Sequence, residues 1–249
     1  MKISDKIKRR KFIKVVGLSG GGLFLASYVP VQSLFAQQDG DPKIFAPGVF
    51  LRIDSNGVVT IIVHRSEMGQ GIKTALPMLV AEELEVDWNK IVIEQADADK
   101  KYGSQTTGGS TSIRRSWEPL RKAGATARVM LITAAANSWN VSPEDCYAEK
   151  GFVINKLNNK KLSYGELVEE ASKLPIPTDV KLKDPKEYKI IGKRVHRVDT
   201  PDKIYGKAIF GIDVVIPGMY YAAVSRCPAF GGSVKSYNSE KTKTSLGKF

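Results

Sequence analysis

Two stretches of the chain repeat one layout: a β-rich run, a loop of glycine and small polar residues, and then a helix. The two copies occupy residues 58–84 and 91–139. Their loops cover residues 65–71, which we call the first loop, and residues 103–112, the second loop. Glycines let a backbone approach a ligand closely, and a helix N-terminus attracts anions. The layout therefore predicts an α+β fold that presents two loops able to bind an anion.

Helical spacing of apolar residues marks the two helices that follow these loops. The first is expected over 74–84, with Thr74 as its N-cap and Pro77 in its first turn, where a missing N–H group costs little. The second is expected over 117–139 and carries many alanines and a glycine. A helix face of such small residues predicts close packing against another backbone.

Turn residues and short β-rich runs predict the remaining elements. Asn56-Gly57 is a strong hairpin signal, because both turn positions favour positive φ. In chain order we expect a polar linker over 37–47, paired strands over 49–54 and 58–63, a strand over 91–96, a short helical turn at Ser142–Glu144, a hairpin around Asn158-Asn159, a helix opened by a Ser163/Glu166 capping box, a proline-rich linker over 175–185, and β-rich runs over 207–215 and 220–226.

The charge and the rare residues exclude several functional classes. The net charge is +12, but seven basic residues and one acid in the first fourteen positions supply half of it. The rest of the chain has no dense basic stripe, which argues against a nucleic-acid partner. Two cysteines are too few for a disulfide framework or a Cys-rich metal site, and two histidines without an HExxH motif argue against a zinc enzyme.

The N-terminus has the pattern of a twin-arginine (Tat) export signal. Arg9-Arg10 is followed by Phe12, and a short glycine-interrupted apolar stretch runs over 15–30. We therefore assign residues 1–38 to a Tat signal and linker. The expected location is the periplasm, or export through the Tat translocase with retention by an uncleaved signal. A basic tail followed by a short apolar anchor is the alternative.

The loop side chains suit a ligand with both polar edges and phosphate groups. Gln70 carries an amide that donates and accepts hydrogen bonds, as a pterin edge requires. Ser110, Thr111 and Ser112 can donate to phosphate oxygens. Neither loop fits the Walker or GxGxxG patterns, so from the residues alone each loop is either an anion or nucleotide site or simply a turn.

Longer strings around the loops resemble a known family. Residues 67–84 (EMGQGIKTALPMLVAEEL) resemble the molybdopterin-binding large subunit of the xanthine dehydrogenase family, most of all the branch that contains the β-subunits of isoquinoline 1-oxidoreductases. The blocks that match in the order of this branch are 106–113, 117–124, 197–203, 206–213 and 217–223. The resemblance spans roughly residues 45–240.

This resemblance implies a domain plan and a cofactor. Residues 39–185 would form a molybdopterin-binding-type α/β domain, and residues 186–249 would begin an α/β-hammerhead domain and break off within it. The cofactor would be molybdopterin with molybdenum, in its cytosine dinucleotide form. The residues expected to contact it are Gly69, Gln70, Gly71, Thr74, Gly109, Ser110, Thr111 and Ser112.

The family's chemistry gives the expected activity. It hydroxylates an aldehyde or N-heterocycle with oxygen from water and passes electrons to [2Fe-2S] clusters, here on a small partner subunit. A glutamate acts as base, and its position would lie beyond Phe249, so we expect no catalytic residue in this chain and no activity from the chain alone. The alternative is an exported non-catalytic binding module that keeps the cofactor-type loops.

Three glutamates and one histidine near the motif match no catalytic position of the family. Glu67, Glu82 and Glu83 are interpreted as surface or capping carboxylates, and His64, which precedes the first loop, as a structural residue.

The export assignment can be tested with a fusion of residues 1–40 to a folded reporter. We expect the reporter to reach the periplasm only through the Tat pathway, because the paired arginines are the recognised feature. Reporter activity in the periplasmic fraction measures export. Equal export after Arg9→Lys with Arg10→Lys would contradict the assignment.

Overall fold

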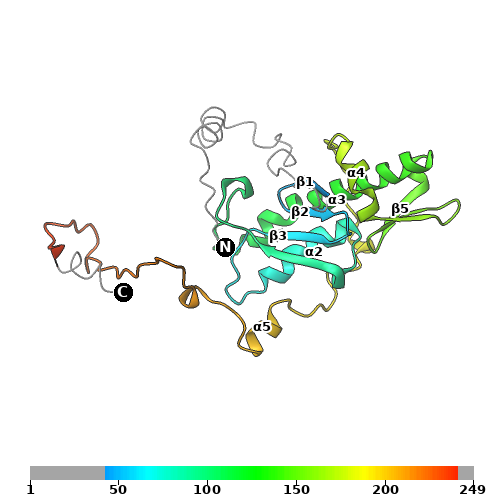
Figure 1. Ribbon diagram of the computed structural model, residues 1–249. Helices are drawn as coiled ribbons and strands as arrows, with labels where there is room; N and C mark the ends of the chain where they lie inside the picture. Colours follow the sequence, from blue (N-terminus) through cyan, green and yellow to red (C-terminus); the bar gives the residue numbers. More distant parts are fainter. Residues whose placement is uncertain (1–42, 241–249) are drawn as a thin grey trace, which may run out of the picture. The chain divides into compact units, whose positions relative to one another are not determined.

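The computed structural model describes residues 43–240, so the expected signal at residues 1–38 lies outside the described residues. The contacts divide the chain into a unit that ends at Gly206 and a second that begins at Lys207. The described part of the first unit contains two sheets and three longer helices, which confirms the expected α+β class (Figure 1).

The larger sheet has the order β1-β2-β3-β4. Its strands are β1 (Ile44–Gly48), β2 (Leu51–Asp54), β3 (Val59–Val63) and β4 (Ile91–Gln95). The first three pair antiparallel, whereas β4 runs parallel to β3, with Ile61 beside Ile93. The two parallel strands are connected through helix α2 (Ile72–Leu84), so both loops start at the same edge of the sheet.

Strand β1 corrects the expectation of a linker over 37–47. Its backbone pairs with β2, and Phe45 is buried in the core. The hairpin between β2 and β3 is confirmed, but only Gly57 of its turn has positive φ, at 82°. The Asp54 carboxylate instead accepts the N–H groups of Asn56 and Val58, at 2.9 and 3.0 Å, and shapes the turn.

Both long helices begin earlier than their sequences predict. Helix α2 starts at Ile72. The residue before it, Gly71, has a φ of 86°, which is outside the helical range, so the loop ends at Gly71. Thr74 is therefore not the N-cap: it lies inside α2, and its hydroxyl accepts the N–H of Val198 at 3.0 Å. Pro77 also lies inside the helix rather than in its first turn. Helix α3 (Ser112–Trp139) likewise begins before the predicted residue 117, at the last residue of the second loop.

Helices α2 and α3 pack against each other as the small residues predict. A Cβ atom on Gly124 of α3 would lie 2.4 Å from the carbonyl oxygen of Val80 in α2. Such a distance is far inside van der Waals contact, so only glycine permits this approach. Leu76, Leu120 and Leu131 of the two helices are buried in the same core as Phe45.

The second sheet is antiparallel, with β5 (Cys146–Glu149), β6 (Phe152–Asn155) and β7 (Lys161–Ser163) in that order. The Ser163/Glu166 capping box opens helix α4 (Tyr164–Lys173) as expected. The short helical turn and the hairpin over Asn158-Asn159 are also confirmed. The 3-10 turns are η2 (Trp88–Lys90), η3 (Lys100–Tyr102), η4 (Pro143–Asp145), η5 (Pro185–Glu187) and η6 (Gly211–Asp213).

Glu82 and Glu83, adjacent on α2, are fully buried, so the interpretation of them as surface carboxylates is wrong. Glu82 accepts the backbone N–H groups of residues 189–191, at 2.6 to 3.1 Å. Glu83 pairs with Arg121 and Arg128 of α3. Neither carboxylate caps a helix, because the backbone N–H groups that they accept belong to non-helical residues about a hundred positions away.

The segment over 181–191 therefore packs on the first unit. The backbone N–H of Lys183 donates to Glu83, and the Lys183 carbonyl accepts from Arg121 at 2.7 Å. Farther along, Thr200–Ile204 forms the short helix α5. The contacts divide the chain after Gly206, because Glu82 and Glu83 bind residues 183–191, and Glu67 and Thr74 bind Arg197 and Val198.

The second unit differs from its expectation. Residues 207–215 and 220–226 form no strands, and η6 is the one complete helical element in the described part of this unit. Its β-rich sequence finds no partner strand among residues 207–240, so its apolar side chains, such as Ile212 and Tyr221, stay exposed. Between residues 43 and 240, no helix is both long enough and apolar enough to cross a membrane.

The buried Glu82 predicts a pH-dependent stability. Burial alone would raise its pKa, but hydrogen bonds from Lys183 and the N–H groups of residues 189–191 hold the pKa below its ordinary value. The stabilisation is therefore present above the ordinary glutamate pKa and is lost as the pH falls through the lowered value.

We expect Glu82→Gln to lower the free energy of unfolding at pH 7 by about 3 kcal/mol, because it removes one charge of a buried pair. The deficit should shrink in acid, where the wild-type carboxyl also becomes neutral. Urea unfolding between pH 3 and 7 measures both effects, and Glu149→Gln is the control, since no ion pair involves Glu149 in the described structure. A deficit that does not change with pH would contradict this account.

Candidate functional site

The structure brings the two loops together at one edge of the larger sheet. Both follow parallel strands, β3 and β4, and so leave the sheet on the same side. The Arg65 guanidinium donates to the carbonyl of Thr106, and the Ser66 N–H donates to the hydroxyl of Thr107 at 3.1 Å. The repeated layout of the sequence thus forms one composite site.

The first loop is organised around the carboxylate of Glu67. This group accepts the backbone N–H groups of Gly69, Gly71 and Lys73, at 2.7 to 3.0 Å. Burial would raise the pKa of Glu67, but these three donors outweigh it and lower the pKa. The N-terminus of α2 therefore already holds an anion that belongs to the chain, and the capping interpretation of Glu67 is confirmed.

Gln70 occupies the tip of the first loop and uses both halves of its amide within the loop. Its Oε1 accepts from the Met68 N–H at 2.6 Å, and its Nε2 donates to the Ser66 carbonyl at 2.9 Å. The side chain is exposed, as is Met68, which is 70% exposed. A polar ligand edge would have to replace these two internal hydrogen bonds.

The second loop leaves the N-terminus of α3 open. Gly109 and Ser110 have consecutive positive φ angles of 59° and 55°, and Ser110 is not a glycine, so this turn is strained. The Thr111 hydroxyl donates to the Gly108 carbonyl at 2.8 Å and does not cap the helix. The N–H groups of residues 112–114 have no acceptor in the described part of the chain, so this end of the helix can receive an anion.

Arg65 is the residue of this site that the sequence did not single out. It is 3% exposed, its Nε has no hydrogen-bond partner, and no carboxylate pairs with it among the described residues. Burial and the nearby Arg115 both lower its pKa. A buried cation without a counter-ion is costly, so an anionic ligand beside it would be favourable. An arginine at the first position of a glycine loop, just after a buried strand, was the available signal.

His64 lies behind the loops, in contacts that fit a structural residue. Its ring is 4.9 Å from that of Phe50, and its Nε2 is 3.4 Å from the Ser116 hydroxyl. Burial and the charge of Arg65 lower the pKa of His64 to about 4, so the ring is neutral at pH 7. Within residues 43–240, no group of three or more His, Cys, Asp or Glu side chains could hold a metal ion.

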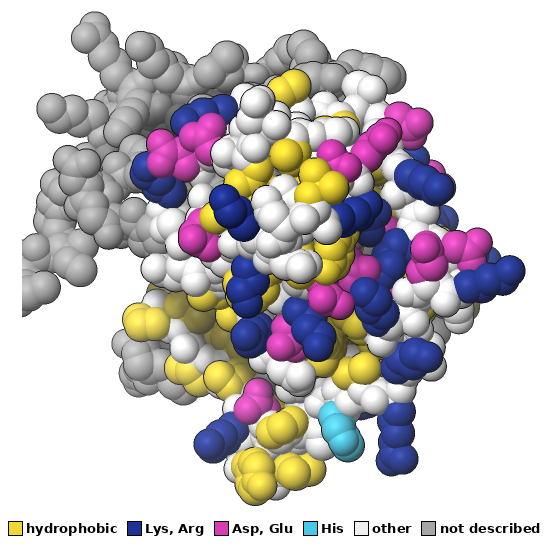
Figure 2. Space-filling view, turned by 90° about the vertical axis from the view of Figure 1, so that its right-hand side faces the viewer, with side chains coloured by type: hydrophobic (Ala, Val, Ile, Leu, Met, Phe, Trp, Pro, Cys, Tyr) yellow, Lys and Arg dark blue, Asp and Glu magenta, His cyan; other side chains and the backbone are white. Residues whose placement is uncertain are grey.

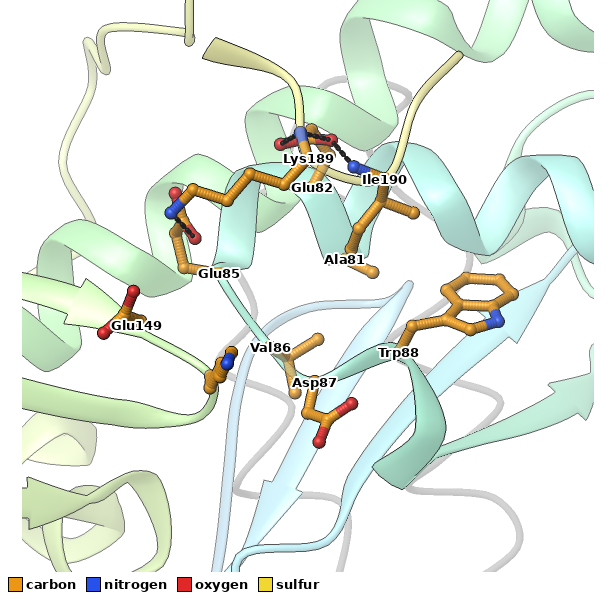
Figure 3. Close-up of a pocket in the computed structure, with 10 residues that line it drawn as sticks. Ala81, Glu82, Glu85, Val86, Asp87, Trp88, Glu149, Lys189 and Ile190 are labelled. Atoms are coloured by element: carbon orange, nitrogen blue, oxygen red, sulfur yellow. Dashed lines mark hydrogen bonds and ion pairs between the residues drawn. The ribbon is translucent and has the colours of Figure 1, made fainter. Parts of the chain in front are cut away.

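A hollow of about 170 Å³ lies at the other end of α2 and is a poorer candidate (Figure 3). Ala81, Trp88 and Ile190 form its apolar wall. Two of its charged groups, Lys189 and Glu85, already pair with each other at 3.0 Å. On the face shown in Figure 2, basic and acidic side chains are also interspersed, so that face offers no single-sign surface to a large polyanion.

Comparison with known proteins matches residues 8–216 to the family of molybdopterin cofactor-binding domains. The β-subunit of isoquinoline 1-oxidoreductase from Brevundimonas diminuta is 30% identical over 91% of this chain and 34% of its own length. The membrane-bound aldehyde dehydrogenase (pyrroloquinoline-quinone) of Gluconacetobacter polyoxogenes is 33% identical over 97% of this chain and 32% of its own length. A nicotinate dehydrogenase subunit of Pseudomonas putida is 33% identical over 74% of this chain and 15% of its own length.

The chain thus spans about a third of the length of the first two relatives. Among solved structures, the quinoline 2-oxidoreductase from Pseudomonas putida 86 is similar with a TM-score of 0.41 and 24% identity, over 50% of this chain and 16% of that chain.

Proposed function

Because this chain belongs to the xanthine dehydrogenase family of molybdopterin-binding subunits, we propose that its two loops hold part of a molybdenum cofactor. The observation that carries the proposal is the open N-terminus of α3 beside the unpaired, buried Arg65. Both features favour an anion, and a molybdopterin carries phosphate. The residues present therefore fit the organic part of the cofactor.

The two loops would divide the cofactor between them. The N–H groups of residues 112–114, with the hydroxyls of Ser110 and Ser112, would receive phosphate oxygens. Gln70 would turn its amide from the loop to the pterin edge, and the exposed Met68 would lie against its rings. The remaining residues proposed to contact the cofactor lie in the two loops or just after them: Gly69, Gly71, Thr74, Gly109 and Thr111.

The activity proposed for the whole enzyme is the hydroxylation of an aldehyde or an N-heterocycle. When bound, the cofactor supplies a centre that exchanges a C–H hydrogen for oxygen from water and takes up two electrons. This chain's own residues bind and orient it. A small [2Fe-2S] subunit as electron acceptor, the cytosine dinucleotide form, and Tat export to the periplasm remain proposals from motif resemblance, as do the domain ranges 39–185 and 186–249.

An exported binding module without catalysis is the second candidate. It would keep the open α3 N-terminus and the loops, but it would bind an anionic pterin or nucleotide without turning over a substrate. Turnover of an aldehyde or N-heterocycle by the purified whole enzyme, monitored by dye reduction, distinguishes the two.

The proposed cofactor contact is tested with Gln70→Ala in the full chain. Losing a hydrogen-bonding amide to a buried polar ligand should weaken cofactor binding by about five- to a hundredfold. Molybdenum by elemental analysis and pterin by fluorescence measure retention after dialysis. Asn158→Ala is the matched control, because its exposed amide also serves its own turn.

Retention that is the same in wild type, Gln70→Ala and Asn158→Ala would show that Gln70 is only a turn residue. Pyrroloquinoline quinone should be assayed in the same samples, since the name of one relative includes it. Stoichiometric quinone without molybdenum would overturn the proposed cofactor.

A further inference from the structure

Residues in the segment 197–203 form hydrogen bonds with the first loop and with the start of α2, although they lie far away in the sequence. We propose that Arg197 is a positioning residue, which fixes the first loop so that Gln70 is held at its tip. The proposal rests on the proposed function for the meaning of Gln70. The fixing of the loop is a separate claim and is tested separately.

The guanidinium of Arg197 binds the loop at two points. It donates to the carbonyl of Gly69 at 2.9 Å and to Oε1 of Glu67 at 3.2 Å. That same Oε1 accepts the N–H groups of Gly69 and Gly71. Arg197 therefore anchors the carboxylate that orders the loop and also the residue directly before Gln70.

Asp199 fixes the guanidinium in turn. Both of its carboxylate oxygens accept from Arg197, each at 3.2 Å, and Lys203 pairs with the same carboxylate. Burial would raise the pKa of Asp199, but Lys203 and Arg197 lower it to about 2, so Asp199 stays charged at working pH. The planar, forked guanidinium of arginine can donate to the first loop and to Asp199 at the same time, which the single ammonium group of a lysine cannot do in the same geometry.

A second hydrogen bond attaches the same segment to helix α2. The backbone N–H of Val198 donates to the hydroxyl of Thr74 at 3.0 Å, in the first turn of α2. The loop is thus held at its carboxylate, at a carbonyl and at the helix that follows it. Thr74, which is also among the proposed cofactor contacts, thus connects α2 to this segment.

Hydrogen–deuterium exchange of the amides of Gly69, Gly71 and Lys73 tests the positioning role in the full chain. In Arg197→Ala we expect these amides to exchange about tenfold faster, the effect of losing roughly one charged hydrogen bond. In Arg197→Lys the charge remains but the fork is lost, so exchange should rise less. Arg194→Ala is the control, because Arg194 is exposed and has no contact with the loop in the described structure.

Faster exchange confined to these amides, with an unchanged melting temperature, supports the role. Unchanged exchange overturns it, as does an equal increase throughout α2 and α3, which would show general destabilisation. If Arg197→Ala fails to fold, the same comparison is made with Arg197→Lys.

Molybdenum retention in the same variants separates the two claims. Faster loss of molybdenum from Arg197→Ala than from Arg194→Ala supports positioning for the cofactor, and partial rescue in Arg197→Lys supports the fork geometry. If the loop amides exchange faster but molybdenum retention is unchanged, Arg197 still positions the loop, and it is the proposed role of that loop in cofactor binding that fails.

Discussion

Two neighbouring carboxylates buried on one helix hold the first unit together. Glu82 and Glu83 are adjacent on α2, so they point in different directions around the helix and satisfy different partners. Glu83 ties α2 to the arginines of α3, whose approach Gly124 makes possible, and Glu82 holds the backbone of residues 189–191. This arrangement fixes α2 and α3, and therefore the loops at their N-termini. A buried carboxylate with so many donors defines one geometry, because any other leaves charge unpaired.

The two loops look alike in sequence but differ in what they offer a ligand. The first loop contains its own anion, Glu67, which occupies the N–H groups at the start of α2. The second loop contains no such carboxylate, so the start of α3 remains open beside Arg65. A phosphate would thus meet donors at the second loop and a carboxylate at the first. Arg197 adds to this difference between the loops, because its guanidinium donates to the carboxylate of Glu67 in the first loop.

The sequence predicted the local elements well and the long-range contacts poorly. Capping residues, the Asn-Gly turn and helical periodicity are local signals, and they located α4, the β2–β3 hairpin and most of α2 and α3. The roles of Thr74, Glu82 and Arg197 depend on partners roughly a hundred or more residues away, which no local pattern encodes. The prediction of strands after residue 207 was wrong, because periodicity shows which residues suit a strand and not whether a partner strand is present.

The difference between the two loops is tested most directly by titrating the folded chain with inorganic phosphate and following backbone amide shifts by NMR. We predict shifts at Ser112, Ile113 and Arg114, which have no acceptor in the described structure, and little change at Gly69 and Gly71, whose amides donate to Glu67. Shifts at Gly69 and Gly71 without any at residues 112–114 would contradict the account, because phosphate would then bind where the chain already holds a carboxylate.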